Sequence, residues 1–245
     1  MHWLILGCLG AGAAYASIGF AFHFAEKDHV TPHQLAIIQS LAGGLFCLAL
    51  AWRAIPLIDA PFAAVSLATG VAQYLAVRLQ QPALARGPFS LMLCAQMLVF
   101  VPATCYGWLF LGETATVWSV LAAAAAIAAV IVGALAADGG THAAISGKWR
   151  AKLLYGALLL AMLILGAESN IANKALEQRS ADFAAVSNVW LLLLFTGLFA
   201  CSLADNLARR AIPWRSRNFY LGGGIAGACS LTGMSLQNMV MAGPA

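Results

Sequence analysis

The side chains in this sequence that could do chemistry are a few polar residues inside long apolar runs. Glu168 is the only carboxylate well inside such a run, and Ser169 and Asn173 follow it on the same predicted helix. Residues three or four apart on a helix are neighbours, so these three side chains share part of one face. An intramembrane carboxylate could bind a cation or carry a coupling proton. The alternative is that Glu168 marks the edge of the membrane, because Asn173 and Lys174 follow within about a turn and a half.

Gln73, Tyr74 and Arg78 form a second polar group, on another apolar run. Tyr74 and Arg78 are one turn apart, and an arginine at the end of a span suits an anionic or carboxylate group on a substrate. The alternative is that Arg78 reaches out to the membrane interface. Gln39 and Gln96 are uncharged donors on two further runs, and they either bind substrate or hold helices together. The sequence therefore predicts this set of substrate-binding residues: Glu168, Ser169, Asn173, Gln39, Gln73, Tyr74, Arg78 and Gln96.

Two stretches of the chain repeat one pattern. Residues 70–89 and 227–245 each begin with a glycine, reach a Leu-Gln-amide triplet nine positions later (70 to 79 and 227 to 236) and then close on Gly-Pro. Each predicts an apolar helix stopped by proline, which lacks an amide hydrogen and restricts the residue before it. A repeated pattern of this kind indicates an internal duplication.

Breaks in the helices are expected at Gly87-Pro88 and, at the corresponding place in the second stretch, at Gly243-Pro244. Broken helices free backbone groups that can coordinate a substrate or an ion, and a plain tight turn is the alternative. Gly112 and Glu113 form a further turn before the fifth apolar run. A carboxylate there suits the positive end of the helix dipole, so the favoured interpretation of Glu113 is a helix cap.

Patterns typical of catalytic and metal sites are missing from the sequence. It holds no G-x-S-x-G, H-E-x-x-H or phosphate-binding P-loop segment, so we expect no enzymatic activity and no cofactor. Histidines and acids gather in residues 23–33, but Pro32 interrupts them and no standard metal-ligand spacing results. The six cysteines are scattered through apolar segments without a C-x-x-C pair, which indicates small buried residues.

The composition is that of an integral membrane protein. Of the 245 residues 62% are hydrophobic and 9% are charged, with a mean hydropathy of +0.85. Soluble domains carry about a quarter charged residues, so too few charges remain here to cover a surface in water. The net charge of +4 is small and lies in loops, and it gives no reason to expect nucleic-acid binding.

Eight apolar segments are long enough to cross a bilayer as helices, which takes roughly 20 residues each. The sequence thus predicts an all-α, polytopic membrane helix bundle. The first segment has no Lys or Arg before it, so we expect a retained helix rather than a cleaved signal peptide. The segments run over about residues 3–24, 34–52, 61–79, 88–110, 115–136, 153–173, 184–204 and 218–241.

The gap at residues 138–152 divides these segments into five and three. We expect residues 1–137 to form a first five-helix repeat, 138–152 a linker, and 153–245 a second, incomplete repeat of three helices. Because five is an odd number, the two repeats would lie upside down relative to one another, an inverted repeat common among secondary transporters. The sequence therefore looks like eight helices of an expected ten.

Short motifs in the chain resemble those of the EamA-type drug/metabolite transporters. Residues 83–88 (ALARGP), an apolar helix, residues 109–113 (LFLGE) and another small-residue helix are similar to the ends of that family's third and fourth helices. Residues 19–26 (GFAFHFAE) and 170–177 (NIANKALE) occupy matching places at the start of each half. The resemblance implies ten helices in two inverted halves, a central substrate cavity and movement of small metabolites or drugs, often outward. Helices nine and ten are missing from this sequence.

Lys and Arg are unevenly distributed over the loops. The loops after predicted helices one, three, five and seven hold ten of the 13, and those after helices two, four and six hold three. The positive-inside rule then places the amino terminus outside the cytoplasm. The family resemblance implies both ends inside it, so the orientation stays open.

Two functions are compatible with these patterns. The first is a secondary-active exporter of small metabolites or drugs in the bacterial inner (plasma) membrane, working without ATP, with a small-molecule substrate and a coupling proton or ion. Its support is the repeat, the broken helices and the missing catalytic patterns. The second is a non-transporting membrane scaffold or partner-dependent subunit, supported by the missing pair of helices and the scarcity of buried charge.

Overall fold

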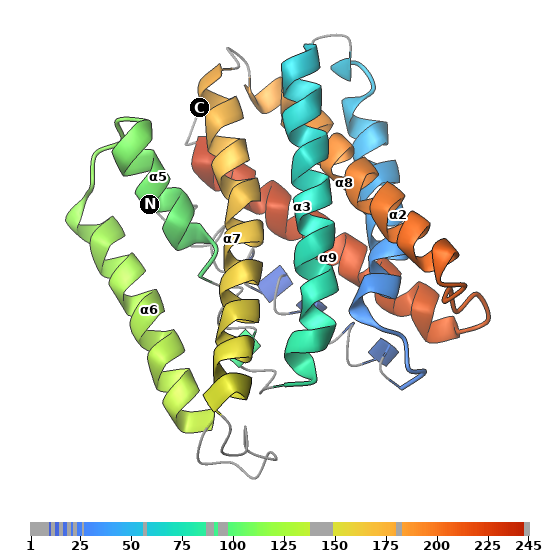
Figure 1. Ribbon diagram of the computed structural model, residues 1–245. Coiled ribbons are helices and arrows are strands. Elements are labelled where there is room, and N and C mark those ends of the chain that lie inside the picture. The colour runs from blue at the N-terminus through green and yellow to red at the C-terminus, as the bar shows by residue number, and fades with distance from the viewer. Residues whose placement is uncertain are drawn as a thin grey trace. The chain divides into compact units, whose positions relative to one another are not determined.

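The computed structural model describes residues 10, 13–14, 17–18, 21, 24–25, 27–55, 58–86, 91–92, 98–137, 149–179 and 183–242. Seven helices run through these residues, which contain no strand, so the all-α prediction is confirmed for this part of the chain (Figure 1). The helices are α2 (Pro32–Ala51), α3 (Ala60–Leu84), α5 (Phe100–Phe110), α6 (Val117–Ala137), α7 (Trp149–Arg179), α8 (Phe183–Ala208) and α9 (Arg217–Ala242).

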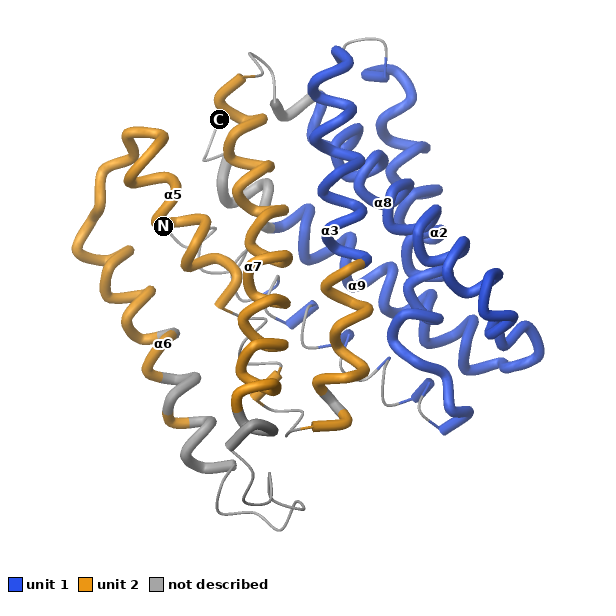
Figure 2. Tube along the Cα trace, viewed as in Figure 1, with its two compact units in different colours: residues 1–74, 180–245 blue, residues 75–179 orange. Residues whose placement is uncertain are grey.

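The chain divides into two compact units, shown in Figure 2. Unit 1 comprises residues 1–74 and 180–245, and unit 2 comprises residues 75–179, so α3 contributes to both. These two units are defined by packing within the chain and do not coincide with the five-helix repeats expected from the sequence. The repeats stay a prediction.

Unit 1 is built around α2, which lies against α8 and α9. Pro32 occupies the first turn of α2, where its missing amide hydrogen does no harm. The Gln34 side chain accepts a hydrogen bond from the backbone of Thr31 at 2.8 Å and closes the start of the helix. The core at this end of the unit consists of Ala25, Val30, Leu35, Ile37 and Phe219.

Glycines let the helices of unit 1 approach closely. A Cβ on Gly70 of α3 would lie 2.3 Å from the backbone oxygen of Leu194 and 2.9 Å from the Cα of Gly197, both on α8. On α9, a Cβ on Gly227 would lie 2.8 Å from the backbone oxygen of Gln39. Small residues at such contacts are the usual means by which membrane helices pack, because lipid gives them no hydrophobic reason to associate.

One end of unit 1 is held together by hydrogen bonds between segments far apart in sequence. The Ser216 hydroxyl donates to the Asp28 carboxylate at 2.6 Å, and the Gln34 amide donates to the Ala211 carbonyl. The Asn206 side chain donates to the His33 carbonyl at 3.3 Å. The turn at residues 27–31, the end of α8 and the start of α9 therefore lie together.

Unit 2 contains the end of α3 and helices α5, α6 and α7, of which α5 and α7 are in contact. A small core joins α3 to α7 through Ala83, Met92, Tyr155 and Met162. A Cβ on Gly166 of α7 would lie 2.7 Å from a methyl carbon of Val99, at the start of α5. Many apolar side chains of α6 are exposed, including Trp118 at 81%.

Four of the described helices contain a stretch long and apolar enough to cross a membrane: Pro32–Ala51, Ala60–Ala83, Leu153–Arg179 and Val186–Ala208. A helix of 20 residues is about 30 Å long, the thickness of the hydrocarbon layer. The first predicted segment, residues 3–24, lies mostly outside the described residues.

Several helices extend beyond the apolar segments that predicted them. The third segment was predicted to end at residue 79, whereas α3 continues through Pro82 to Leu84. The proline lies in the last turn, and its carbonyl accepts a hydrogen bond from the Arg86 side chain at 2.8 Å. Helix α7 extends to Arg179 instead of residue 173, because its last turns contain good helix formers such as Lys174 and Glu177. The predicted segments followed hydrophobicity alone, and these ends are polar.

Candidate functional site

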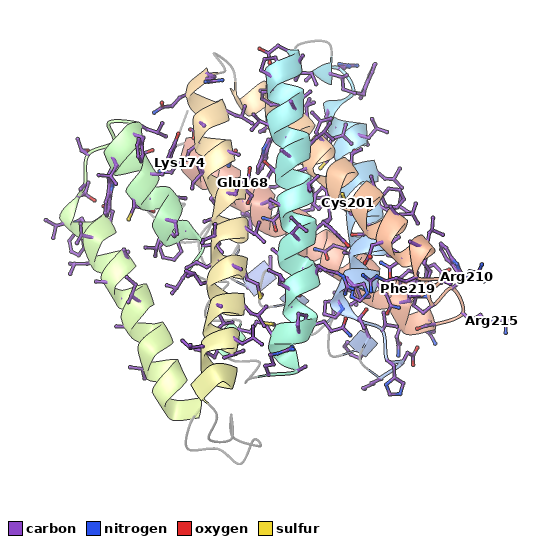
Figure 3. The ribbon with its side chains drawn as sticks, in the orientation of Figure 1. Glu168, Lys174, Cys201, Arg210, Arg215 and Phe219 are labelled. Carbon is purple, nitrogen blue, oxygen red and sulfur yellow. The ribbon has the colours of Figure 1, made fainter. Side chains whose placement is uncertain are left out.

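Helix α7 carries the first predicted polar group in unit 2. Ser169 and Asn173 are buried, at 7% and 2% exposed, and Glu168 beside them is half-buried. The Ser169 hydroxyl donates to the Gly166 carbonyl at 3.3 Å, within its own helix. The structure thus places the two neutral polar residues on the buried side of α7 and the carboxylate at the edge of that side. Figure 3 shows Glu168 on the same helix as Lys174.

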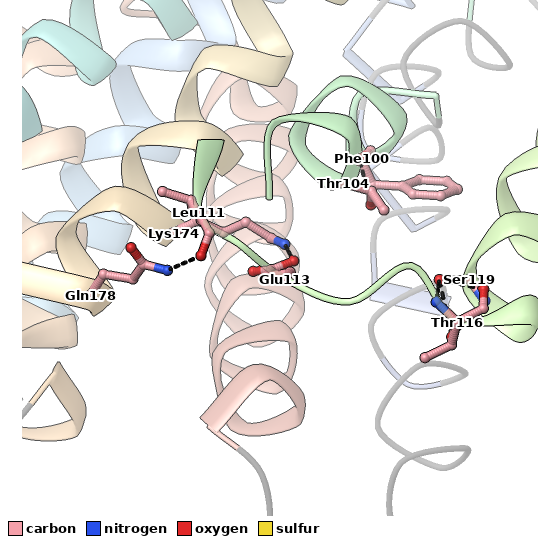
Figure 4. Close-up of polar contacts among 8 residues, drawn as sticks. All are labelled: Phe100, Thr104, Leu111, Glu113, Thr116, Ser119, Lys174 and Gln178. Carbon is pink, nitrogen blue, oxygen red and sulfur yellow. Dashed lines mark hydrogen bonds and ion pairs between the residues drawn. The ribbon is translucent and has the colours of Figure 1, made fainter. Parts of the chain in front are cut away.

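Beyond this group, α7 makes an ion pair with the turn that follows α5. Lys174 Nζ lies 2.6 Å from Glu113 Oε2, and the two side chains are 18% and 39% exposed (Figure 4). The pair lies directly over Gly107, where a Cβ would be 2.2 Å from Glu113 Oε2 and 2.7 Å from Lys174 Nζ. Near it, the Gln178 amide donates to the Leu111 carbonyl at 3.3 Å. Two segments of unit 2 are joined here by charge and hydrogen bonds.

The backbone of this turn depends on Gly112. Its φ is +69°, in the left-handed region, and no atom lies within 4 Å of where its Cβ would be. The Glu113 amide returns to the Gly107 carbonyl at 3.1 Å. A glycine in this conformation is the usual way in which a helix ends.

The interpretation of Glu113 as a cap of the next helix is wrong. Helix α6 begins at Val117 and has no acid in its first turn. Its cap is Thr116, whose hydroxyl accepts from the Ser119 amide at 3.1 Å. Glu113 lies four positions before α6 and is directed to Lys174 on α7 instead.

The remaining described site residues are spread over both units. In unit 1, the Gln39 amide donates to the Ser230 hydroxyl at 2.7 Å and so joins α2 to α9. Gln73 and Tyr74, on α3 in the same unit, are half-buried. Arg78 is half-buried on the part of α3 that belongs to unit 2. Gln39 therefore has the helix-joining contact that was the alternative to substrate binding.

Some predicted positions lie outside the described residues, and one relevant residue was missed. Gln96 and the two Gly-Pro breaks, Gly87-Pro88 and Gly243-Pro244, are among those positions. The missed residue is Gln80, which is 5% exposed and whose side-chain oxygen has no hydrogen-bond partner among the described residues. It belongs to the Leu-Gln-amide triplet of the repeated pattern, and that signal could have singled it out.

Comparison with known proteins gives the family. The model of the EamA-like transporter family matches residues 2–134, which is more than half of the 245-residue chain. No curated protein and no solved structure matches the chain. The matched residues include α2, α3, α5 and most of α6, together with the Gly112–Glu113 turn. The apolar helices and this match together identify the chain as an integral membrane protein that belongs to the EamA-like transporter family.

Proposed function

We propose that the protein is a secondary-active exporter of small metabolites or drugs in the bacterial inner membrane. The observation that carries the proposal is the match of the EamA-like transporter family over residues 2–134. The family is one of transporters rather than enzymes, and the sequence contains no ATP-binding pattern that could drive transport directly. An ion or substrate gradient is then the source of energy.

The proposal includes an inverted repeat of five-helix units with the substrate between them. The repeated pattern at 70–89 and 227–245 supports it. Within unit 2, Glu168 is the proposed coupling group, since a carboxylate at a half-buried position inside an apolar helix can exchange a proton or hold a cation. Ser169 and Asn173 supply uncharged hydrogen-bonding groups on the buried side of the same helix.

Flux into and out of loaded vesicles tests this proposal. The purified chain is reconstituted into liposomes and assayed with amino acids, nucleobases and cationic dyes, with and without an imposed proton gradient. We expect gradient-dependent flux of at least one class, and we expect Glu168→Gln to abolish it while the protein is still produced and folded. The matched control is Glu177→Gln, which removes a carboxylate from the polar end of the same helix.

The outcomes separate transport from its coupling. Unchanged flux in Glu168→Gln would assign Glu168 to the edge of the membrane and leave the transporter in place. No flux of any compound by a folded sample would favour the second candidate, a scaffold or partner-dependent subunit. The scarcity of charged residues within the apolar segments is the feature that supports this second candidate.

A further inference from the structure

The end of unit 1 where α8 stops and α9 starts carries a dense group of cations. Two segments distant in sequence contribute to it, since the Ser216–Asp28 hydrogen bond of 2.6 Å ties the turn after residue 25 to the loop before α9. We define this basic end by Lys27, Arg209, Arg210, Arg215 and Arg217. All five of these side chains are exposed.

In the part of the chain that the structure describes, most of this charge is not paired with a carboxylate, and the nearby Asp28 accepts a hydrogen bond from Ser216. Arg209 pairs with Asp205 at 2.6 Å, one turn back on α8, and this hydrogen bond raises the pKa of the guanidinium. Among the described residues, Arg210, Arg215 and Arg217 make no ion pair. In Figure 3 the Arg210 and Arg215 side chains extend away from the helices. These exposed guanidinium groups are therefore available to bind anions.

Two of these arginines occupy positions where local structure favours other residues. Arg210 has a φ of +51° and ends α8 in a turn in which its amide returns to Leu207 and the amide of Ala211 to Asn206. Glycine or asparagine normally takes that left-handed position. Arg217 is the first residue of α9, where the helix dipole disfavours a cation. The cost is conformational at Arg210 and electrostatic at Arg217, and a residue kept at such a cost is a reason to look for a function.

The basic end also carries the aromatic residues of a membrane interface. Trp214 is 55% exposed and Tyr220 is 45% exposed, and the Tyr220 hydroxyl donates to the Trp214 carbonyl at 3.1 Å. Trp and Tyr concentrate at the level of the lipid headgroups. At the other end of α2, which is about one hydrocarbon thickness away, Trp52 is 59% exposed and contacts Arg53. This separation of the aromatic residues matches the distance between the two headgroup layers of a bilayer, so we take the arginines to lie at headgroup depth.

From this juxtaposition we propose that the basic end of unit 1 binds the headgroups of anionic phospholipids. Guanidinium groups form paired hydrogen bonds with phosphate oxygens, and the positive end of α9 adds to the attraction. A lipid phosphate held there fixes the depth of α8 and α9 in the leaflet. The basic end then faces the leaflet with the higher anionic lipid content.

Native mass spectrometry of the full chain in a neutral detergent tests this binding. The probes are phosphatidylglycerol and phosphatidylcholine with the same acyl chains. We expect retained phosphatidylglycerol adducts and few phosphatidylcholine adducts. Each arginine near a membrane surface contributes roughly fivefold to such binding, so Arg210→Gln/Arg215→Gln/Arg217→Gln should weaken it on the order of 100-fold at low ionic strength.

Further variants separate local binding from net charge and from folding. The control Arg53→Gln/Arg86→Gln/Arg179→Gln removes three arginines elsewhere and should keep the adducts. The triple lysine variant at 210, 215 and 217 should keep most of them, because the charge is conserved. Arg210→Gly removes one positive charge, so it should weaken binding about fivefold. Because glycine is the usual residue at this left-handed position, the variant should still fold.

Three results would overturn the proposal. They are full phosphatidylglycerol binding by the triple glutamine variant, an equal loss in the control triple, and displacement of the lipid by millimolar inorganic phosphate. The last would identify a site for free anions instead of a lipid-binding surface.

Discussion

Helices α5 and α8 end in the same backbone conformation with different residues. After α5 the left-handed position is Gly112, with φ +69°, and after α8 it is Arg210, with φ +51°. The residue that follows Gly112 returns to pair with Lys174 inside unit 2, whereas Arg210 makes no ion pair among the described residues of the chain. The turn that joins helices has the residue that its backbone favours. The turn that presents charge outward has one that its backbone disfavours.

One of the two largest effects is expected from Gly107→Ala, which removes the space in which the ion pair of the α5 turn lies. The new Cβ would be 2.2 Å from Glu113 Oε2, so the pair has to move. Both neighbours are the ends of flexible side chains, which can rotate away at the expense of their ion pair, so we expect a loss of about 1–2 kcal/mol, in the lower part of the range for overpacking. The free energy of unfolding in mixed micelles, titrated with SDS, measures it.

The control for that substitution is Gly156→Ala on α7, where a Cβ has no neighbour within 4 Å. It should be neutral or stabilising by up to about 1 kcal/mol, because alanine is the better helix former. If Gly107→Ala keeps wild-type stability, the Glu113–Lys174 pair does not depend on this space. The claim that the turn after α5 serves to join helices would then lack support.

A loss of similar size is expected from Gly112→Ala. No atom crowds the new Cβ, so the cost comes from the left-handed backbone alone and is about 1–2 kcal/mol. The same SDS titration measures it. Gly112→Asn is the matched control, since asparagine adopts this conformation more readily, and it should lose less. Equal losses in both variants would point to a cause other than φ.

The smallest effect should have the opposite sign. Arg210→Gly relieves the left-handed backbone of α8, and part of this gain is offset by the freedom that glycine gives to the unfolded chain. We expect stabilisation by about 0.5–1 kcal/mol. The exposed Arg215→Gly is the control, and it should not be stabilising. A destabilised Arg210→Gly would mean that the Arg210 side chain makes a contact that holds the turn.

The sequence predicted the helical class and most helix positions because both follow from long apolar runs. Helices α2, α6 and α9 begin and end within two residues of their predicted segments. The end of α7 was missed because Lys174, Glu177 and Gln178 are polar, and the hydrophobic signal stops before them. Helix propensity in those last turns would have extended the prediction.

The contacts of the site residues were less predictable. Glu113 and Lys174 are 61 positions apart, and the sequence around either residue does not indicate that the other is its partner. The same holds for Gln39 and Ser230, which are 191 positions apart. Local sequence can identify a carboxylate near a helix end, but its partner depends on how α5 and α7 pack. Ser169 and Asn173 are four positions apart on α7 and both are buried, which local sequence does indicate.

The contact between Gly70 and Gly197 also constrains how the gene can change. Every nonsynonymous single-base change in a glycine codon introduces a side chain with a Cβ or a stop. At Gly70 such a Cβ meets backbone atoms of Leu194, Gly197 and Leu198, and at Gly197 it meets the backbone of Leu67 and Gly70. Backbone atoms cannot rotate away as a side chain can. A Cβ at either position would clash with the backbone around the other, so no single-base change in either codon gives a residue that fits the contact.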